Sequence, residues 1–273
     1  MNGPGDTNAL QAGRRLPGAL SAGLIVARLF FRVTLGRRRT LWVGLLMLLP
    51  VLLALWYRLF ESGEGPDFFN KAVLGFFLQF AALGLSLYFG VSAVRDEIED
   101  KTIVYLFARP VSRGVILGGK ILAVVAVLAF GIAVDTGLVY LITVSKDGAM
   151  ALVTNLDRLA QAVGVLALAT LAYTAFFSLI GVLLNKPMIV ALLIGFGYEL
   201  VVSNLPGGIP QITLMFYLKS LLGVAPEGMQ IFAFMVPGIG TASIVLSLTV
   251  ALLCAAIFLF LALFIGSRKE YRV

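Results

Sequence analysis

Two acidic side chains lie inside apolar stretches of the sequence, where ionisable residues are rare. Asp135 falls near the middle of one stretch, and Glu199 lies near the outer end of another. An acid at the centre of a bilayer costs about 2.5–3.5 kcal/mol on insertion scales, so Asp135 should face protein or water. We interpret Asp135 as lining a substrate pathway or a dimer interface; the alternative is a neutral or hydrogen-bonded Asp, with Thr136 or Tyr140 as candidate partners. Glu199 is expected to be a shallow residue, reached by water, at an outer gate of the same pathway.

Side chains for enzyme chemistry are scarce. The sequence has no histidine, which removes the commonest metal ligand and the usual proton shuttle. The single cysteine, Cys254, cannot form an intramolecular disulfide. Intramembrane zinc and Ser–His proteases need histidine, and aspartyl types need two facing acids, whereas only Asp135 is central. We therefore predict no catalytic residue, no metal and no cofactor on this chain.

The longest polar interruption runs from Arg95 to Lys120 and reads RDEIEDKTIVYLFARPVSRGVILGGK. It holds nine of the 35 charged residues and far exceeds the roughly 4–6 residues of most connections. Its first part should extend the preceding helix, and Pro110 should break that helix before a short helical turn around Ser112–Leu117, capped by Ser112. Apolar residues exposed there need a covering surface, so we interpret the loop as a docking element for a soluble partner. The alternative is a loop whose charges only set the topology.

The stretch Gly114–Ile121 reads GVILGGKI and matches the G-x-x-x-x-G-K part of a phosphate-binding loop. However, Ile121 stands where Ser or Thr must hold magnesium, and no buried strand precedes it. We therefore predict no nucleotide site. Gly118 and Gly119 are expected to permit a tight entry into the next apolar stretch, and Lys120 to anchor that stretch at the inner headgroups.

Composition places the whole chain in a membrane. Of its 273 residues, 60% are hydrophobic and only 13% are charged, and the mean hydropathy is +1.01. Ordinary globular proteins carry about 25% charged residues. Too few polar side chains remain to cover a surface in water, so membrane lipid is the expected surroundings. The net charge of +7 comes from residues beside the apolar stretches, so no nucleic acid partner is expected.

The predicted fold class is an all-α polytopic membrane protein with six transmembrane helices, each near the roughly 20 residues that span a bilayer. The fifth span is short and runs into the helix-breaking sequence SNLPGGIP. After it, Gln211–Pro237 should form short or re-entrant outer helices, with a hidden seventh span as the alternative. The six spans are Thr40–Phe60, Ala72–Val94, Ile121–Val144, Ala160–Leu184, Met188–Val202 and Ala242–Gly266.

A single membrane domain, residues 40–266, therefore makes up most of the chain. Residues 1–18 are expected to be disordered, and 267–273 to form a short tail. Residues 19–39 should form an interfacial helix with arginines at the lipid headgroups, a plain basic segment being the alternative. Sixteen of the 21 Lys and Arg residues fall on the side of the membrane that carries the loop 95–120. The positive-inside rule then puts this loop and both termini in the cytoplasm, in a multi-pass inner-membrane protein.

The loop resembles that of the type-2 ABC exporter permeases, the type V membrane subunits. The shared pattern is an acidic segment, then Thr, Leu, Arg-Pro-Val-Ser-Arg and Gly-Lys. Lys101 departs from it, because Gly is common at that position, which leaves the turn before Thr102 open. The motif covers about a tenth of the chain, and the six-span layout agrees with it. The matching residues are Glu97, Glu99, Thr102, Leu106, Arg109, Pro110, Val111, Ser112, Arg113, Gly119 and Lys120.

This resemblance implies the permease subunit of an ATP-driven exporter. In that family the loop forms a coupling helix seated in a groove of a separate ATPase subunit, and here Arg109–Gly119 would be that segment. ATP and magnesium would be bound by the partner ATPase. Two copies, or one copy and a homologous permease, would enclose a pathway for a hydrophobic or amphipathic substrate leaving the cytoplasm or inner leaflet.

An autonomous secondary transporter or channel is the alternative function. It would need coupling-ion or filter groups near the midplane, often in inverted repeats with broken helices. Only the fifth predicted span is broken, and no second broken span matches it. A neighbouring gene for an ATPase with a complete phosphate loop would favour the exporter.

Overall fold

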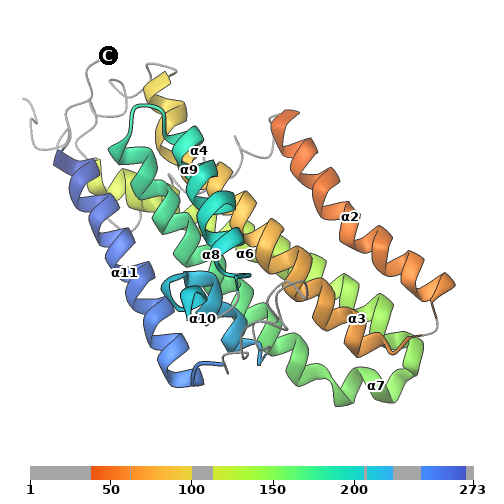
Figure 1. Cartoon of the computed structure of the whole chain (residues 1–273). Helices are drawn as coiled ribbons and strands as arrows, with labels where there is room; N and C mark the ends of the chain where they lie inside the picture. Colours follow the sequence, from red (N-terminus) through yellow and green to blue (C-terminus); the bar gives the residue numbers. More distant parts are fainter. Residues whose placement is uncertain (1–37, 62, 100–112, 206–207, 224–240, 269–273) are drawn as a thin grey trace, which may run out of the picture.

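Figure 1 shows the computed structural model of the chain. Within the residues that it describes, every regular element is a helix and no strand occurs, which confirms the all-α prediction. The expected disordered segment, nearly all of the interfacial helix 19–39 and the end of the tail lie outside the described residues. The described ranges are 38–61, 63–99, 113–205, 208–223 and 241–268.

Long apolar helices alternate with short connecting ones. In chain order the elements are α2 (Arg38–Phe60), α3 (Gly65–Ala72), the π-helix η1 (Val73–Leu85), α4 (Ser86–Glu99), α6 (Arg113–Val144), the 3₁₀ turn η2 (Ser145–Asp147), α7 (Ala149–Thr154), α8 (Leu156–Leu183), α9 (Pro187–Leu192), the π-helix η3 (Leu193–Leu200), the 3₁₀ turn η4 (Ile209–Ile212), α10 (Leu214–Leu221) and α11 (Ile244–Arg268).

Four helices of the described chain are long and apolar enough to cross a membrane: Gly65–Arg95, Gly114–Asp147, Leu156–Leu183 and Ile244–Arg268. They coincide with the predicted second, third, fourth and sixth spans. The predicted first and fifth spans coincide with two shorter apolar helices, Met47–Phe60 within α2 and Pro187–Leu200 in α9 and η3. The chain is therefore a multi-pass membrane protein.

The predicted break after the fifth span is present, because η3 leads into a turn at Ser203–Leu205. The described part of the expected outer helices is η4 and α10. With eight residues, α10 is about 12 Å long at 1.5 Å per residue, far too short to span a bilayer. Residues 224–240, the rest of that predicted region, lie outside the described residues.

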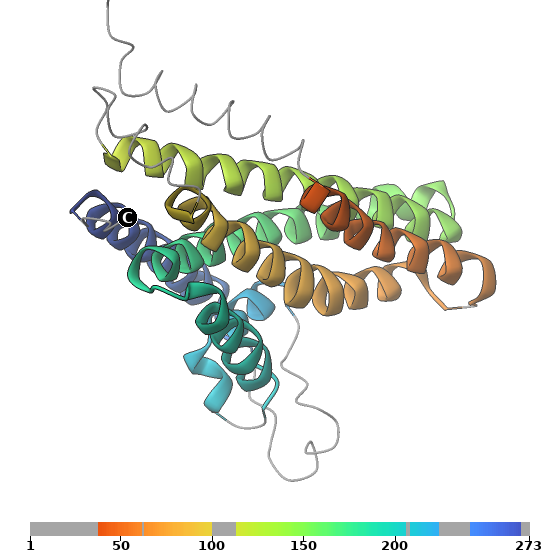
Figure 2. The ribbon, with the colours of Figure 1, turned by 90° about the horizontal axis from the view of Figure 1, so that it is seen from above.

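The helix bundle has two ends, which we call the Arg95 end and the α7 end. At the Arg95 end, α4 and α8 finish, α6 begins and α11 finishes. At the α7 end, α2 finishes, α3 begins and the η2–α7 segment joins α6 to α8. Figure 2 shows α2 on one side of the η1–α4 rod and the α9–η3 and α10 helices on the other.

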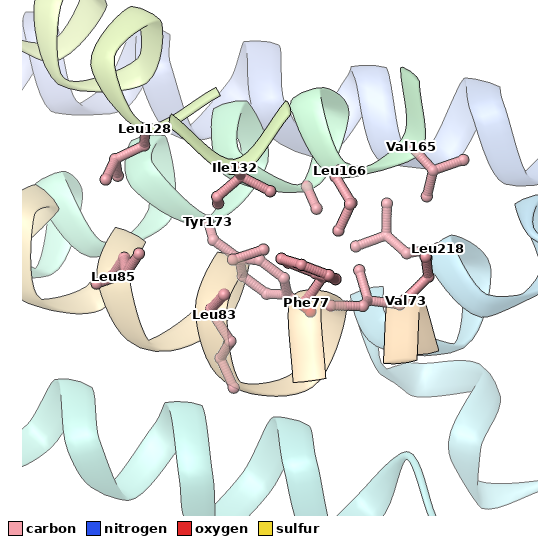
Figure 3. Close-up of a cluster of buried hydrophobic side chains, with 14 of the residues drawn as sticks. Val73, Phe77, Leu83, Leu85, Leu128, Ile132, Val165, Leu166, Tyr173 and Leu218 are labelled. Atoms are coloured by element: carbon pink, nitrogen blue, oxygen red, sulfur yellow. The ribbon is translucent and has the colours of Figure 1, made fainter. Parts of the chain in front are cut away.

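The centre of the bundle is α8, which packs against α4, α6 and α11. Figure 3 shows part of its core, where Tyr173 and Leu166 lie close to Phe77 of η1 and Ile132 of α6. All four of these side chains are at most 1% exposed. Large rings packed against branched side chains fill this interior, so the arrangement of α6, α8 and η1 is fixed by close packing.

Small residues bring α4 and α8 into close contact. A Cβ on Gly90 would lie 3.1 Å from the Thr174 carbonyl oxygen, and one on Gly181 would lie 3.3 Å from the Val91 oxygen. The Ser178 hydroxyl donates a 3.1 Å hydrogen bond to the Gly90 carbonyl. Lipid gives no hydrophobic drive for helices to associate, so small residues and interhelical hydrogen bonds are the usual means of packing them in membranes.

The outer faces of α2 and α11 are covered with exposed apolar side chains. Trp56 and Leu59 of α2 are 61% and 73% exposed, and Val245 and Phe260 of α11 are 76% and 65% exposed. A surface of this kind would associate in water, whereas lipid covers it at no cost. The exposed pattern therefore agrees with the membrane location.

Candidate functional site

The predicted docking loop begins and ends at the Arg95 end of the bundle. Glu97 and Glu99 lie on the last turn of α4, and Arg113 is the first residue of α6. Gly119 and Lys120 follow within α6. The remaining predicted docking residues, Thr102, Leu106, Arg109, Pro110, Val111 and Ser112, lie outside the described residues.

The structure corrects the expected short helical turn around Ser112–Leu117. Instead of a separate short helix around residues 112–117, α6 runs without a break from Arg113 to Val144. A Cβ on Gly118 would lie 3.3 Å from Leu263 Cδ2 of α11, so this glycine serves helix packing. The helical course of residues 114–121 also excludes a phosphate-binding loop, which cradles phosphate with backbone N–H groups in a loop conformation.

Lys120 was predicted to anchor the third span at the inner headgroups, and the structure shows that its side chain is buried in protein. Its side chain is 7% exposed, and its Nζ donates a 3.4 Å hydrogen bond to the Ala93 carbonyl oxygen of α4. A buried ammonium is stable only when its hydrogen bonds are made. The sequence suggested snorkelling because Lys120 precedes an apolar stretch, but it could not show that α4 passes alongside. Lys120 thus joins the two helices that bound the predicted docking loop.

A second connection at the Arg95 end was not anticipated from the sequence. The Arg95 guanidinium donates a hydrogen bond to the Asn185 carbonyl oxygen in the short turn between α8 and α9. Arginine presents several donors in a rigid fork, which suits it to hold a turn of backbone. At this end, α4 is therefore tied to α6 through Lys120 and to the α8–α9 turn through Arg95.

Gly266 extends these contacts to α11. A Cβ placed on Gly266 would lie 2.5 Å from Leu117 Cδ2 of α6 and 3.6 Å from Val182 Cγ2 of α8. The absence of a side chain there lets α11 approach both helices closely. The start of α6, next to the predicted docking loop, is thus packed against α11 and hydrogen-bonded to α4.

Asp135 faces protein, as predicted from the free-energy cost of placing an acidic side chain in lipid. It is 6% exposed on α6, but neither expected partner binds it. The Tyr140 hydroxyl donates to the Leu152 carbonyl oxygen at 2.6 Å, and Thr136 Oγ1 is buried without a hydrogen bond among the described residues. Asp135 Oδ2 is buried without a partner there as well. Within this part of the chain, neither candidate partner, Thr136 or Tyr140, is therefore hydrogen-bonded to Asp135, and a neutral Asp135 stays a prediction.

Glu199 is buried, not exposed to water as predicted. It is 8% exposed and accepts hydrogen bonds from the backbone N–H groups of Leu214 at 3.2 Å and Met215 at 3.1 Å. The Tyr173 hydroxyl donates a third bond at 3.2 Å. A carboxylate at a helix N-terminus satisfies free N–H groups and interacts favourably with the helix dipole. Glu199 thereby joins η3, α8 and α10.

A buried lysine near Glu199 was also missed. Lys219 of α10 is 5% exposed, and its Nζ donates a 2.8 Å hydrogen bond to Asn204 Oδ1. Burial lowers the pKa of Lys219 to about 8. The Asn204 amide in turn donates to the Leu200 carbonyl oxygen at 2.6 Å. Two polar contacts, through Glu199 and through Lys219, therefore fasten α10 to the end of the fifth helix.

An apolar hollow of about 450 Å³ lies at the α7 end between α6, α7 and the start of α8. Leu138, Leu141 and Val153 are among its lining residues, and its only polar lining group, the Tyr140 hydroxyl, already donates to Leu152. Such a hollow can take hydrocarbon but offers nothing for catalysis. Within the described residues, no cluster of acidic or cysteine side chains has the arrangement of a metal site.

Comparison with known families gives one match. Residues 35–202 match the family described as ABC-2 family transporter protein. The match covers more than half of the chain and includes α2, the region around the predicted docking loop, Asp135 and Glu199. No curated protein matches the chain.

Proposed function

Because the chain belongs to the ABC-2 transporter family, we propose that it is the permease subunit of an ATP-driven exporter in the inner membrane. Membership makes the chain a membrane component of ABC transport, and a component of that kind works with an ABC ATPase. The finer proposal is that six spans, with both termini in the cytoplasm, carry a hydrophobic or amphipathic substrate outward. Two copies, or one copy and a homologous permease, enclose the pathway.

The observation that carries this proposal is the arrangement at the Arg95 end. The loop with the acidic, Arg-Pro-Val-Ser-Arg and Gly-Lys pattern is flanked by α4 and α6, and Lys120 joins these helices through Ala93. Arg95 further connects α4 to the α8–α9 turn. A force applied to the loop would therefore move several membrane helices together, which is what a rigid-body switch requires.

Glu199 and Asp135 have different places in the proposed mechanism. Glu199 fastens α10 to η3 and α8, so in this proposal it acts as a positioning residue for the outer gate. Asp135 lies about two thirds of the way along α6, and its Oδ2 has no hydrogen-bond partner among the described residues. It is the side chain that we place on the substrate pathway. The chain itself binds no nucleotide in this account, and the partner holds ATP and magnesium.

We expect that replacing residues 109–113 with Gly and Ser strongly weakens ATPase binding. Arginines at a protein interface are frequent hot spots, and losing one or two should cost about 2 kcal/mol or more, roughly thirtyfold in Kd. The measurement is co-purification of the ATPase with the tagged permease in mild detergent, followed by titration. The same Gly–Ser replacement of residues 269–273 is the matched control. A loop variant that still binds its ATPase with unchanged affinity would overturn the docking proposal.

A further inference from the structure

Asp135 lacks a counter-charge from the helices around it. Between Ile121 and Val144, α6 has no Lys or Arg, and the same holds for residues 73–94, 159–183 and 244–267 of the other long helices. The nearest cation on α2, Arg58, donates to the Ile142 carbonyl oxygen and to Ser145 Oγ. No ion pair within the described residues therefore neutralises this carboxylate.

Protonation of Asp135 would not complete its hydrogen bonding. A protonated carboxyl needs an acceptor for its proton and an ionised one needs donors. The structure gives Oδ2 neither, although this oxygen is buried. The neighbouring hydroxyl, Thr136 Oγ1, is likewise buried without a partner among the described residues. An unpaired carboxylate oxygen in an apolar interior carries a free-energy cost that a ligand with hydrogen-bond donors would remove.

The surface beside Asp135 is open. Gly131 lies one turn earlier, and residues four apart lie on the same face of a helix. Gly131 is exposed, and a Cβ built there would meet no atom within 4 Å. Asp135 itself is only 6% exposed, so a ligand seated against Gly131 would reach the carboxylate from the apolar face of the helix. A molecule that fits needs a hydrocarbon body and one polar head.

We infer that Asp135 forms a recognition site for the protonated amine of a cationic amphipathic molecule, which approaches beside Gly131. An ammonium supplies three donors and the missing positive charge, and its hydrocarbon tail lies on the apolar face of α6. This inference rests on the proposed function, since it names the chemical class of the transported substrate. Anionic and uncharged amphiphiles lack the charge that the site requires.

The test uses the full chain in phosphatidylcholine nanodiscs and two probes with the same tail, radiolabelled dodecylamine and dodecanol, with empty discs subtracted. A charge-assisted hydrogen bond is worth about 1.5–3 kcal/mol, so dodecylamine should bind at least about tenfold more tightly than dodecanol. Asp135→Asn should remove this preference, and Asp135→Glu should retain most of it. Equal binding of the two probes by the natural sequence, or an unchanged preference in Asp135→Asn, would overturn the inference.

Two glycine variants test the direction of approach. Gly131→Leu should weaken dodecylamine binding about as much as Asp135→Asn. Gly137→Leu is the matched control, because a Cβ there also meets no atom within 4 Å while Gly137 lines the apolar hollow on another side of α6. If both variants bind dodecylamine as the natural sequence does, the approach beside Gly131 is wrong.

Two further outcomes are separable from the ligand result. If a second copy of the chain supplies the partner of Asp135, Asp135→Asn will change the oligomeric mass in the discs, the dodecylamine preference will be absent, and the inference fails. ATPase co-purification with the natural sequence is measured in parallel. ATPase binding without a dodecylamine preference refutes this inference alone, whereas absence of ATPase binding refutes the proposed function whatever the ligand result.

Discussion

Replacing Glu199 with Ala is expected to lower the free energy of unfolding by about 2–4 kcal/mol, because three donors would lose their acceptor inside the protein. These donors are the N–H groups of Leu214 and Met215 and the Tyr173 hydroxyl. The first two belong to the first turn of α10, so the short helix should detach from η3 before the bundle unfolds. Denaturation in detergent, followed by circular dichroism, measures the loss.

Three variants make this prediction specific. Glu199→Gln keeps one acceptor oxygen at the same place and should lose less than half as much stability. Tyr173→Phe removes only one of the three bonds and should cost about 1 kcal/mol. Glu61→Ala removes an acid that is exposed at the end of α2 and should change nothing measurable. An unfolding midpoint for Glu199→Ala equal to that of Glu61→Ala would show that the carboxylate does not hold α10.

Replacing Lys120 with Met is expected to separate ATPase binding from its stimulation. The variant keeps the apolar stem but loses the ammonium that reaches the Ala93 carbonyl oxygen. The docking loop is intact, so the ATPase should still co-purify. The mechanical link between α6 and α4 is weakened, so stimulation of ATP hydrolysis by the permease should fall about tenfold, within the usual range of coupling free energies.

Lys186→Met is the control for Lys120→Met. Lys186 lies in the α8–α9 turn at the same end of the bundle but is exposed, so its loss should leave stimulation unchanged. A Lys120→Met permease that stimulates its ATPase normally would show that the buried lysine only stabilises the fold. Equal losses in the two variants would instead indicate a nonspecific effect of charge.

The long helices and the place of Asp135 were predictable because each follows from local composition. An uninterrupted apolar stretch of some 20 residues has to span the bilayer, and an acid in its middle has to avoid lipid. Hence four predicted spans coincide with long helices, and Asp135 faces inward. The docking loop was recognisable by the order of its residue types, although most of that motif lies outside the described residues.

The errors concern contacts between segments far apart in the sequence. Glu199 was expected in water because it lies near the end of a span, yet α10 folds back and covers it. Lys120 was expected at the headgroups, yet α4 supplies a carbonyl within reach. In each case the local sequence indicates the depth of a residue in the membrane, but its exposure also depends on a distant helix that packs against it.

The same limit applies to the polar contacts that the sequence analysis missed. Arg95 lies 90 residues from its acceptor Asn185, and no spacing rule relates them. Lys219 lies nine residues after the end of the helix-breaking sequence SNLPGGIP, and nothing in that local sequence indicates that it is buried. Its burial depends on Asn204, which holds both the end of the fifth helix and the lysine. A polar residue at the end of a helix, followed closely by a short amphipathic segment, therefore indicates that the two can be joined by a buried hydrogen bond.

Site-specific photocrosslinking tests the central claim most directly. A benzophenone amino acid is placed at position 109 in the predicted docking loop or at position 150 in α7, where Met150 is 77% exposed. The complex with the ATPase is then irradiated in native membranes. The account predicts a covalent adduct with the ATPase from position 109 and none from position 150. An adduct from position 150, or none from position 109 in a complex that still co-purifies, would contradict it.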